Sequence, residues 1–426
     1  MSTAKRSGII DMASRQLTKI IAVTGTKGKT STVRAIHYSL QAVRGRDMLR
    51  VDTNEVMFGP VKLHGIRSSM QRYGFVPTLA PGRFLSYAGE PLEEEWAVLE
   101  ASIGCARVGL GYASHVIGIF TNVYDDHVGT VDYLQDRNDL ADAKASFIFG
   151  AIRAGGAAIY NADDPLVFQR LSGIPTAKQV TKIGFALDSH AQGLEFADVK
   201  IFPDDQDVVI RIDNENKHRL SLTEMRWALE GKHIPTLQNA LAIVGALWFV
   251  SQYDSSYDFI ELLNSLKHYQ YRDDGGRLVQ LRASNGANIL LDFAHERESL
   301  QHIAKYARAI SGKSGRVIGI IRLDSARPAN HIIDTTRSVA PLFDQLVIYD
   351  KDVTKGVEPA SKGVAELMYR TARETSVSSV RLSTKEEDAL LYAQAEAAPD
   401  DTVVHIISNP EISLELVRKV FDLPRS

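Results

Sequence analysis

The sequence predicts an α/β protein with two domains. Short β-branched runs alternate with helix-length segments along most of the chain, and the alternation is broken at the polar, glycine-bearing stretch YRDDGGR (271–277). Such alternation is typical of a parallel sheet covered by helices. The 426 residues are also too many for one ordinary hydrophobic core. We therefore expect one domain over residues 1–272 and a second over residues 273–426.

The N-terminal half is predicted to begin as a parallel α/β unit. Its expected strands each end in a small or polar residue: IIAVTG (20–25), WAVLEA (96–101), VIGIFTN (116–122) and AAIYNADD (157–164). Helical patterns follow the first strand at 30–43 and the third at 137–155. We expect these strands to lie side by side, with their carboxyl ends at one edge of the sheet.

The pattern of polar and apolar residues changes between residues 185 and 227. Polar and apolar residues alternate there, which predicts an antiparallel insert or an edge extension of the sheet. A long helix is expected next, at 235–253, with an apolar face continuous enough for packing. The apolar run inside it, 239–250, is too short to span a bilayer.

The C-terminal half repeats the α/β alternation. Strands are predicted at 287–294, 316–322, 345–350, 379–383 and 402–408, and helices at 299–310 and 359–374. This pattern predicts a second, smaller parallel sheet.

The amino-acid composition limits the kinds of partner and metal site that we expect. The net charge of -3, from 49 basic and 52 acidic side chains, gives no reason to expect nucleic acid or an anionic membrane as partner. The single cysteine, Cys105, excludes an internal disulfide and a multi-cysteine metal site. The N-terminus has no apolar stretch of signal-peptide length. We expect a cytoplasmic protein, with homo-oligomerisation left open.

The segment AVTGTKGKTSTVR (22–34) has the ingredients of a phosphate-binding loop. The general pattern has Gly where this chain has Val23, so the strict motif is not met. Gly25 and Gly28 nevertheless allow a tight turn between a buried strand and a helix that begins at Thr30. That order directs backbone N–H groups at an anion, and Lys29 would neutralise its charge. By itself the peptide also fits a glycine-punctuated turn.

Other polar residues stand at predicted strand ends or in nearby helices. Glu100 ends the strand WAVLEA and is a candidate metal ligand, or a solvated strand-end side chain. His127, in TNVYDDHVG, follows two carboxylates and fits either a metal ligand or a polar loop. Lys144, inside a helix, reads on its own as a surface lysine.

Candidates in the C-terminal half surround one buried strand. Asp292 and His295, in LLDFAHE, lie just past it, where they can reach a crevice at the sheet edge. A turn or cap role is the alternative for Asp292. Arg277 lies in the GGR of the expected domain boundary.

Taken in order, these segments resemble the Mur ligase superfamily of cell-wall amino-acid ligases, folylpolyglutamate synthetases and cyanophycin synthetases. The matching segments are TGTKGKT, Glu100, TNVYDDHVG, NADDP (161–165), GKHIPTLQNALA, GGR and DFAHE. The sequence is most similar to the Mur-ligase-like half of cyanophycin synthetase, because EASIGCARVGL resembles the ETARGGILRxGL of that family.

The chain departs from that family at several positions. Ala101 stands in place of Thr, Ile103 in place of Arg and Cys105 in place of Gly, and one residue is missing after Cys105. DFAHE also replaces DYAHN. The resemblance implies that these positions lie near the place where the acceptor or the acyl-phosphate would be handled.

The resemblance implies a P-loop-type central ATPase domain with a parallel sheet and a smaller Rossmann-like C-terminal domain. It also implies ATP and Mg²⁺ as cofactors. The implied nucleotide-binding residues are Thr26, Lys27, Gly28, Lys29, Thr30, Ser31, Asn239 (adenine), Arg277 (phosphates), Asp292 (ribose) and His295.

The resemblance also implies metal ligands and catalytic residues. The implied metal ligands are Thr30 and Glu100 for one Mg²⁺ and His127 for a second. The implied catalytic residues are Lys29, His127, Lys144 (a lysine that many of these ligases carbamylate) and Arg327, which would meet the incoming substrate.

The activity that the resemblance implies is ATP-dependent amide bond formation. The enzyme would phosphorylate a carboxylate to an acyl-phosphate, which the amine of an amino acid or acidic peptide then attacks. Catalysis would come from positioning and charge neutralisation, with domain closure excluding water. The alternatives are a polyglutamate or folate-type ligase and a non-catalytic partner subunit of a larger ligase.

Overall fold

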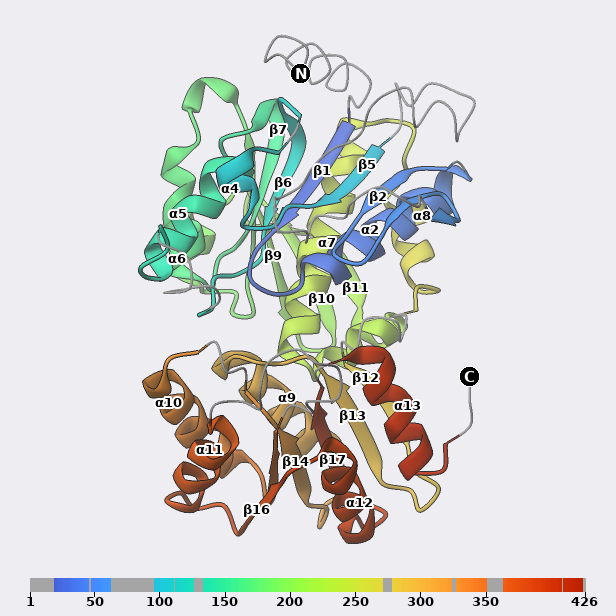
Figure 1. The fold of residues 1–426 in the computed structure, drawn as a ribbon. Helices are drawn as coiled ribbons and strands as arrows, with labels where there is room; N and C mark the ends of the chain where they lie inside the picture. Colours follow the sequence, from blue (N-terminus) through green and yellow to red (C-terminus); the bar gives the residue numbers. More distant parts are fainter. Residues whose placement is uncertain are drawn as a thin grey trace. The chain divides into compact units, whose positions relative to one another are not determined.

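The computed structural model describes residues 19–45, 47–62, 96–110, 112–125, 133–270, 278–323, 327–350, 363–407 and 409–423. The chain forms two compact units, Met1–Tyr271 and Arg272–Ser426. Each unit is an α/β structure built around its own sheet (Figure 1). The predicted α/β fold class is confirmed. The stretch 271–277, where we expected the boundary, lies outside the described residues.

The sheet of the first unit has the strand order β11-β10-β9-β8-β7-β6-β1-β5-β2-β3-β4. Strands from β2 to β9 in that order run parallel, whereas both edges are antiparallel. The strands are β1 (Lys19–Thr24), β2 (Leu49–Val51), β3 (Val56–Phe58), β4 (Val61–Lys62), β5 (Trp96–Glu100), β6 (His115–Phe120), β7 (Ile152–Asn161), β8 (Thr181–Phe185), β9 (Val199–Asp204), β10 (Asp207–Ile212) and β11 (Glu215–Ser221).

Helices cover both faces of this sheet. On one face lie α2 (Lys29–Arg44), α7 (Ile234–Tyr253) and α8 (Phe259–Leu266); on the other lie α4 (Cys105–Val108), α5 (Arg137–Ile148) and α6 (Pro165–Phe168). Strand β1 is buried on both sides: Ile21 and Val23 belong to one core cluster, and Ile20 and Ala22 to the other. This period of two is the strand geometry that a continuous apolar run requires in a covered parallel sheet.

Two predictions for the first unit can be compared with the observed bounds of its strands and helices. The alternating segment 185–227 does form an antiparallel extension, because β9, β10 and β11 pair in sequence at one edge of the sheet. The helix expected over 137–155 is wrong at its C-terminal end: α5 ends at Ile148 and the chain enters β7 at Ile152. A Cβ at Gly150 would lie 2.2 Å from Ser146 O, so this exit from the helix requires a glycine.

Helix α7 extends beyond the apolar run 239–250 at both ends. Within the described residues it is the one helix whose length and composition would allow it to cross a membrane, yet 78% of its most apolar stretch is buried inside the protein. Gly245 lets it lie close to Ile183 and Ile201 of the sheet. These contacts are those of a core helix.

The second unit has a six-stranded sheet in the order β12-β13-β17-β14-β15-β16. Strand β12 is antiparallel to β13 and the others run parallel. The strands are β12 (Val279–Arg282), β13 (Asn288–Asp292), β14 (Val317–Ile321), β15 (Gln345–Tyr349), β16 (Ser379–Ser383) and β17 (Thr402–Ile406); the helices are α9 (Arg297–Ile310), α10 (Ala329–Val339), α11 (Val364–Arg373), α12 (Glu386–Glu396) and α13 (Pro410–Val420).

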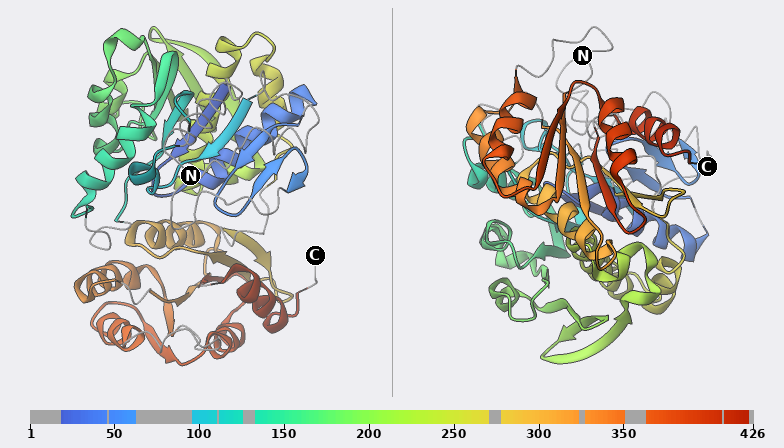
Figure 2. Two further views of the ribbon diagram at one scale, coloured as in Figure 1. Left: turned by 45° about the horizontal axis from the view of Figure 1, so that its top comes forward. Right: turned by 90° about the horizontal axis from the view of Figure 1, so that it is seen from below.

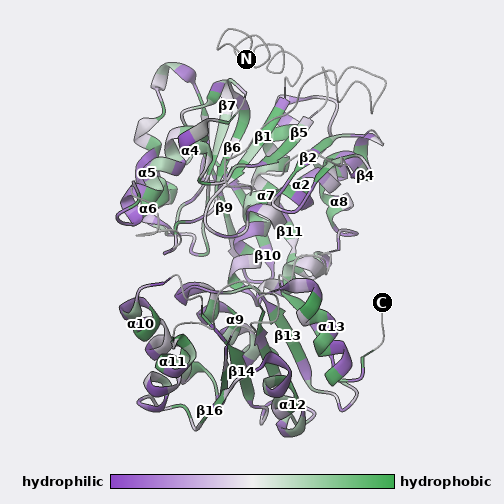
Figure 3. Ribbon diagram, in the orientation of Figure 1, coloured by the Kyte–Doolittle hydropathy of each residue, from purple (hydrophilic) through white to green (hydrophobic). Residues whose placement is uncertain are grey.

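Helices lie on both faces of the second sheet as well (Figure 2). Side chains of α12 and α13 share a core cluster with strands β13, β14, β15 and β17. Colouring by hydropathy shows apolar strands inside each unit and polar residues on the outer faces of the helices (Figure 3). All strands expected in this half are present, with boundaries that differ by at most two residues.

Candidate active site

The loop between β1 and α2 takes a conformation that two glycines make possible. Gly25 has φ 142° and Gly28 has φ 85°, both in the region that side chains disfavour. A Cβ on Gly25 would lie 1.9 Å from Thr121 Oγ1, and one on Gly28 would lie 2.1 Å from Asn239 Oδ1. The glycines therefore allow both the turn and the close approach of neighbouring segments.

The end of β6 supports this loop from the side. The Asn122 side chain accepts hydrogen bonds from Lys27 N at 2.8 Å and Thr26 N at 3.2 Å, and it donates to Lys27 O at 3.2 Å. Thr121 Oγ1 donates to Lys27 O at 2.6 Å. The TN of TNVYDDHVG thus shapes the loop, a role that sequence reasoning did not assign.

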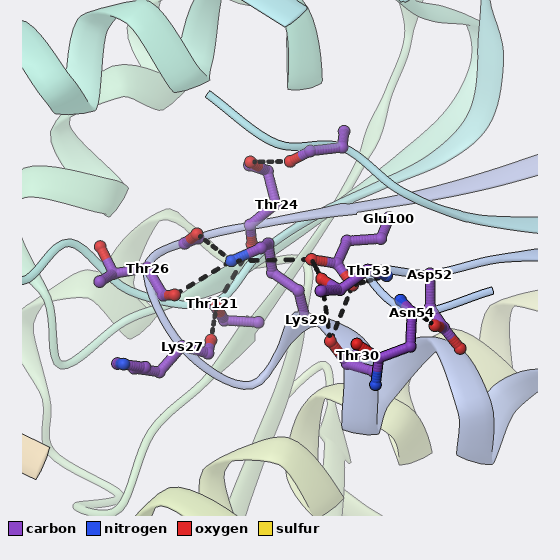
Figure 4. A network of polar contacts seen from close by, with 12 residues as sticks. Thr24, Thr26, Lys27, Lys29, Thr30, Asp52, Thr53, Asn54, Glu100 and Thr121 are labelled. Atoms are coloured by element: carbon purple, nitrogen blue, oxygen red, sulfur yellow. Dashed lines mark hydrogen bonds and ion pairs between the residues drawn. The ribbon is translucent and has the colours of Figure 1, made fainter. Parts of the chain in front are cut away.

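The first turn of α2 is suited to an anion. Its first N–H groups have no partner within the helix, and no acidic residue lies in this turn. Lys29 Nζ lies above the loop and donates to Gly25 O at 3.1 Å and Thr26 O at 3.0 Å (Figure 4). It is also 3.9 Å from Glu100 Oε1. Backbone donors and a lysine therefore converge on one loop, as phosphate binding requires.

Glu100 ends β5 at the foot of this helix and is 1% exposed. Its Oε2 accepts from Thr30 Oγ1 at 2.8 Å and from Thr53 N at 3.1 Å, and its Oε1 accepts from Thr53 Oγ1 at 2.6 Å (Figure 4). A carboxylate beside a hydroxyl is a donor set of hard oxygens, which suits a divalent cation such as Mg²⁺. The alternative of a solvated strand-end side chain is wrong.

Thr53 was missed by sequence reasoning. It lies in a short turn between β2 and β3, and no motif or periodicity marks it.

Lys144 is a buried residue of this site. It is 4% exposed, and its Nζ donates to Gly25 O at 2.9 Å from the opposite face of the sheet to α2. The reading of Lys144 as a surface lysine is therefore wrong. Helix α5, which carries it, begins in a capping box formed by Asp136 and Asp139. That cap fixes the start of α5 at Arg137, seven residues before Lys144, which contacts the loop.

The NADDP segment connects β7 to the same loops. Asn161 Nδ2 donates to Thr121 O at 2.9 Å, and Asp164 Oδ2 accepts from Val123 N at 2.8 Å. Burial raises the pKa of Asp164, although hydrogen bonds from Val123 and Leu166 oppose the rise. The segment therefore orders the end of β6, which in turn orders the loop between β1 and α2.

Four further predicted residues lie either in the first unit or outside the described residues. Asn239, on α7, is 7% exposed and faces Gly28, and Ser31 lies in the first turn of α2. His127 and Arg277 lie outside the described residues.

The other candidates belong to the second unit. Asp292 ends β13 and accepts from Leu278 N at 2.8 Å, a hydrogen bond to the residue just before the neighbouring strand β12. The His295 ring lies 2.9 Å from Phe293 O and 3.6 Å from Glu296. Arg327 lies just before α10. Among the described residues, no group of three or more Asp, Glu, His or Cys side chains is placed to hold a metal ion.

Comparison with known proteins agrees with this geometry. The model of the Mur ligase middle domain matches residues 23–247. A cyanophycin synthetase of Nostoc sp. is 22% identical over 396 residues, which are 91% of this chain and 41% of that protein. A UDP-N-acetylmuramoyl-L-alanyl-D-glutamate--2,6-diaminopimelate ligase of Nostoc sp. is 25% identical over 334 residues, which are 77% of this chain and 60% of that protein.

Solved structures share the fold. A bifunctional folylpolyglutamate synthase/dihydrofolate synthase of Yersinia pestis, complexed with AMPPNP and Mn ion, has a TM-score of 0.66 at 15% identity, covering 98% of this chain and 92% of that one. A pseudomurein peptide ligase type C of Methanothermus fervidus has a TM-score of 0.64 at 16% identity, covering 97% and 81%.

The chain spans about two fifths of the length of the cyanophycin synthetases that it matches. The middle-domain match covers more than half of the chain and includes the phosphate loop, Glu100 and Lys144. The resemblance inferred from the ordered motifs is confirmed, and this chain belongs to the Mur ligase family.

Proposed function

We propose that this chain is an ATP-dependent, ADP-forming carboxylate–amine ligase. The observation that carries the proposal is the convergence of a glycine loop, Lys29, Thr30 and Glu100 at the start of α2. That arrangement supplies backbone donors, a cation and hard oxygen ligands at one point. Solved relatives in this fold are complexed with AMPPNP and Mn ion, which supports a nucleotide and a divalent metal here.

Each residue has a distinct task in this proposal. The N–H groups of the loop and of the first turn of α2 bind phosphate oxygens. Lys29 exchanges its two loop carbonyls for these anionic oxygens, a stronger, charge-assisted interaction. Thr30 and Glu100 hold the divalent metal, which we propose is Mg²⁺ and which supplies charge neutralisation when bound.

The reaction activates a carboxylate, because a carboxylate is a poor electrophile in water. The γ-phosphoryl group passes to the substrate carboxylate, and Lys29 and the loop stabilise the charge that spreads over its oxygens. An amine then attacks the acyl-phosphate and phosphate leaves. We propose an amino acid or acidic peptide as substrate, as in a cyanophycin synthetase, which is the name of several relatives.

The roles of the remaining predicted residues are proposed by analogy with the family. Asn239 is proposed for adenine, Arg277 for phosphate, and Asp292 and His295 for the nucleotide. His127 and Lys144 are proposed for the catalytic centre, and Arg327 for the incoming substrate.

A panel assay tests the proposed function. Phosphate and ADP release from ATP is measured with single amino acids, acidic peptides and a folate-type acceptor. We expect release that depends on one class of acceptor and is lost in Lys29→Ala. Tight nucleotide binding without release for any acceptor would instead favour a non-catalytic subunit, and release with the folate-type acceptor alone would favour a polyglutamate-type ligase.

A further inference from the structure

Both oxygens of Glu100 are held by one neighbouring residue. Thr53 donates its N–H to Oε2 at 3.1 Å and its hydroxyl to Oε1 at 2.6 Å. Thr30 Oγ1 donates to the same Oε2 at 2.8 Å. These contacts fix the rotamer of a buried carboxylate before any metal binds, so the position of Thr53 determines where the carboxylate points.

The turn that carries Thr53 is shaped by the side chain of Asp52. It joins β2 to β3, whose last pair is Val51 and Val56, and Asp52 N donates to Glu55 O at 3.0 Å. Asp52 Oδ1 accepts from Asn54 N at 2.9 Å and from Glu55 N at 3.2 Å. An aspartate that binds backbone N–H groups two and three residues ahead is a common way to fix a tight turn.

The other oxygen of Asp52 ties this turn to α2. Oδ2 accepts from Arg34 Nε at 2.8 Å and lies 3.2 Å from Arg50 Nε, and Asp52 is fully buried. Arg34 lies on α2 four residues after Thr30, so the two side chains share one face of the helix. Helix α2, which carries Thr30, and the turn that carries Thr53 are therefore connected through the Arg34–Asp52 pair as well as through Glu100.

Glu55 completes the charge balance of this cluster. Its carboxylate lies 3.7 Å from Arg34 Nη2 and contacts Arg50 Nη2, so Arg34 and Arg50 face two acidic partners. A buried ion cluster contributes little net stability, because desolvation offsets the Coulomb attraction. The cluster instead restricts the local geometry, because its ion pairs hold the turn in one position relative to α2.

We propose that Asp52 is a positioning residue which, through Arg34 and Thr53, orients Glu100 for metal–nucleotide binding. This inference rests on the proposed function of the Thr30–Glu100 pair. Asp52 itself touches neither metal nor substrate in this proposal. It acts by holding the turn, and therefore Thr53, at the distance from Glu100 that the structure shows.

The test uses Asp52→Asn, Thr53→Val and the double variant in the full chain. Asparagine keeps the size of Asp52 but lowers its attraction for Arg34, and valine replaces the hydroxyl of Thr53 with a methyl group of similar size. Binding of Mn²⁺ with AMPPNP is followed by calorimetry at varied Mn²⁺. We expect each variant to need roughly 10-fold more Mn²⁺, the usual effect of losing a partner of a metal ligand. We expect the double variant to be no weaker than the weaker single variant.

Two further variants keep the test specific. Thr53→Ser retains the hydroxyl and should restore the Mn²⁺ requirement of the native protein. Asp401→Asn is the matched control: Asp401 is a buried aspartate of the second unit that pairs with Arg316 at 2.8 Å and accepts from the N–H of Ala398. It should lower the unfolding temperature without changing the Mn²⁺ requirement.

Several outcomes would overturn the inference. Native-like Mn²⁺ dependence in Thr53→Val or Asp52→Asn would do so, as would additive losses in the double variant or an equal shift in Asp401→Asn. Failure of the proposed function is distinguishable, because it would leave the native protein unable to release phosphate while these binding shifts remain.

Discussion

Lys29 is the residue on which the proposed chemistry depends most directly. We expect Lys29→Ala to lower substrate-dependent ADP formation by roughly 100-fold or more, because one preorganised charge at a phosphoryl transfer site is typically worth that much. The measurement is the initial rate of ADP release at saturating acceptor.

Lys178→Ala is a matched control for that change. Lys178 also donates to two backbone carbonyls, Gly150 O at 2.9 Å and Ile152 O at 2.7 Å, but it lies outside the loop. It should retain the native rate. Equal rates for Lys29→Ala and the native protein would disprove the assignment of Lys29.

Glu100 offers a second test at the level of a residue. Glu100→Gln keeps the shape of the side chain but removes the charge that attracts a divalent cation. We expect the Mg²⁺ concentration for half-maximal phosphate release to rise at least about 10-fold. Glu386→Gln, a buried glutamate of the second unit, should leave the Mg²⁺ titration unchanged. If the Glu100→Gln titration is unaltered, Glu100 does not hold the metal.

At the scale of elements, the phosphate loop depends on the space at Gly25 as well as on its φ angle. Gly25→Ala places a Cβ against Thr121 Oγ1 and the Asn122 backbone, whereas Gly45→Ala, at the end of α2, meets nothing within 4 Å. Both substitutions impose a strained positive φ worth about 1 kcal/mol.

We therefore expect Gly25→Ala and Gly45→Ala to differ in their affinity for the nucleotide. Gly25→Ala should lose measurable nucleotide binding, while Gly45→Ala should bind normally and unfold at a slightly lower temperature. Calorimetry with AMPPNP and a thermal melt separate the two effects. Similar nucleotide affinities for both variants would show that backbone strain, and not the Thr121 contact, dominates at Gly25.

Element prediction succeeded where local patterns were long. Strands β1, β5 and β6, the five parallel strands of the second sheet, and the long helices α2 and α7 were expected close to their observed bounds, whereas the antiparallel strand β12 was not expected. The hairpin of β2 and β3 was not expected, because its strands have three residues each and include the charged Arg50. So short a strand has no periodicity to detect; its pairing with β5 stabilises it.

At the scale of the whole molecule, two buried histidines predict acid sensitivity. Burial lowers the pKa of His37 and of His115 to about 4, although hydrogen bonds to Met48 O and Ile148 O oppose the shift. The unfolded chain binds a proton at each near pH 6.5, and the folded chain does so only near pH 4. The free energy of unfolding should therefore fall as the pH drops through this window and be insensitive to these groups above it.

The size of this effect is up to roughly 3 kcal/mol for each histidine. Urea unfolding at several pH values between about 7 and about 5 measures it, and a His37→Gln/His115→Gln double variant should show a shallower slope. An unchanged slope in the double variant would mean that other groups cause the acid sensitivity.

Taken by itself, the sequence determined the α/β class and the glycine turn before α2, because a strand, a glycine turn and a helix N-terminus are contiguous in the chain. It also placed Glu100 in a motif order that identified the family, and the family resemblance then implied a role for Lys144.

Only the tertiary structure decided which side chains share the site. Asn122 is 95 residues from Lys27, Lys144 is 119 from Gly25, and Thr53 is 47 from Glu100. These partners meet because β2, β5, β1 and β6 lie side by side in that order with their carboxyl ends at one edge. That order results from packing across the whole sheet, which no local pattern in the chain encodes.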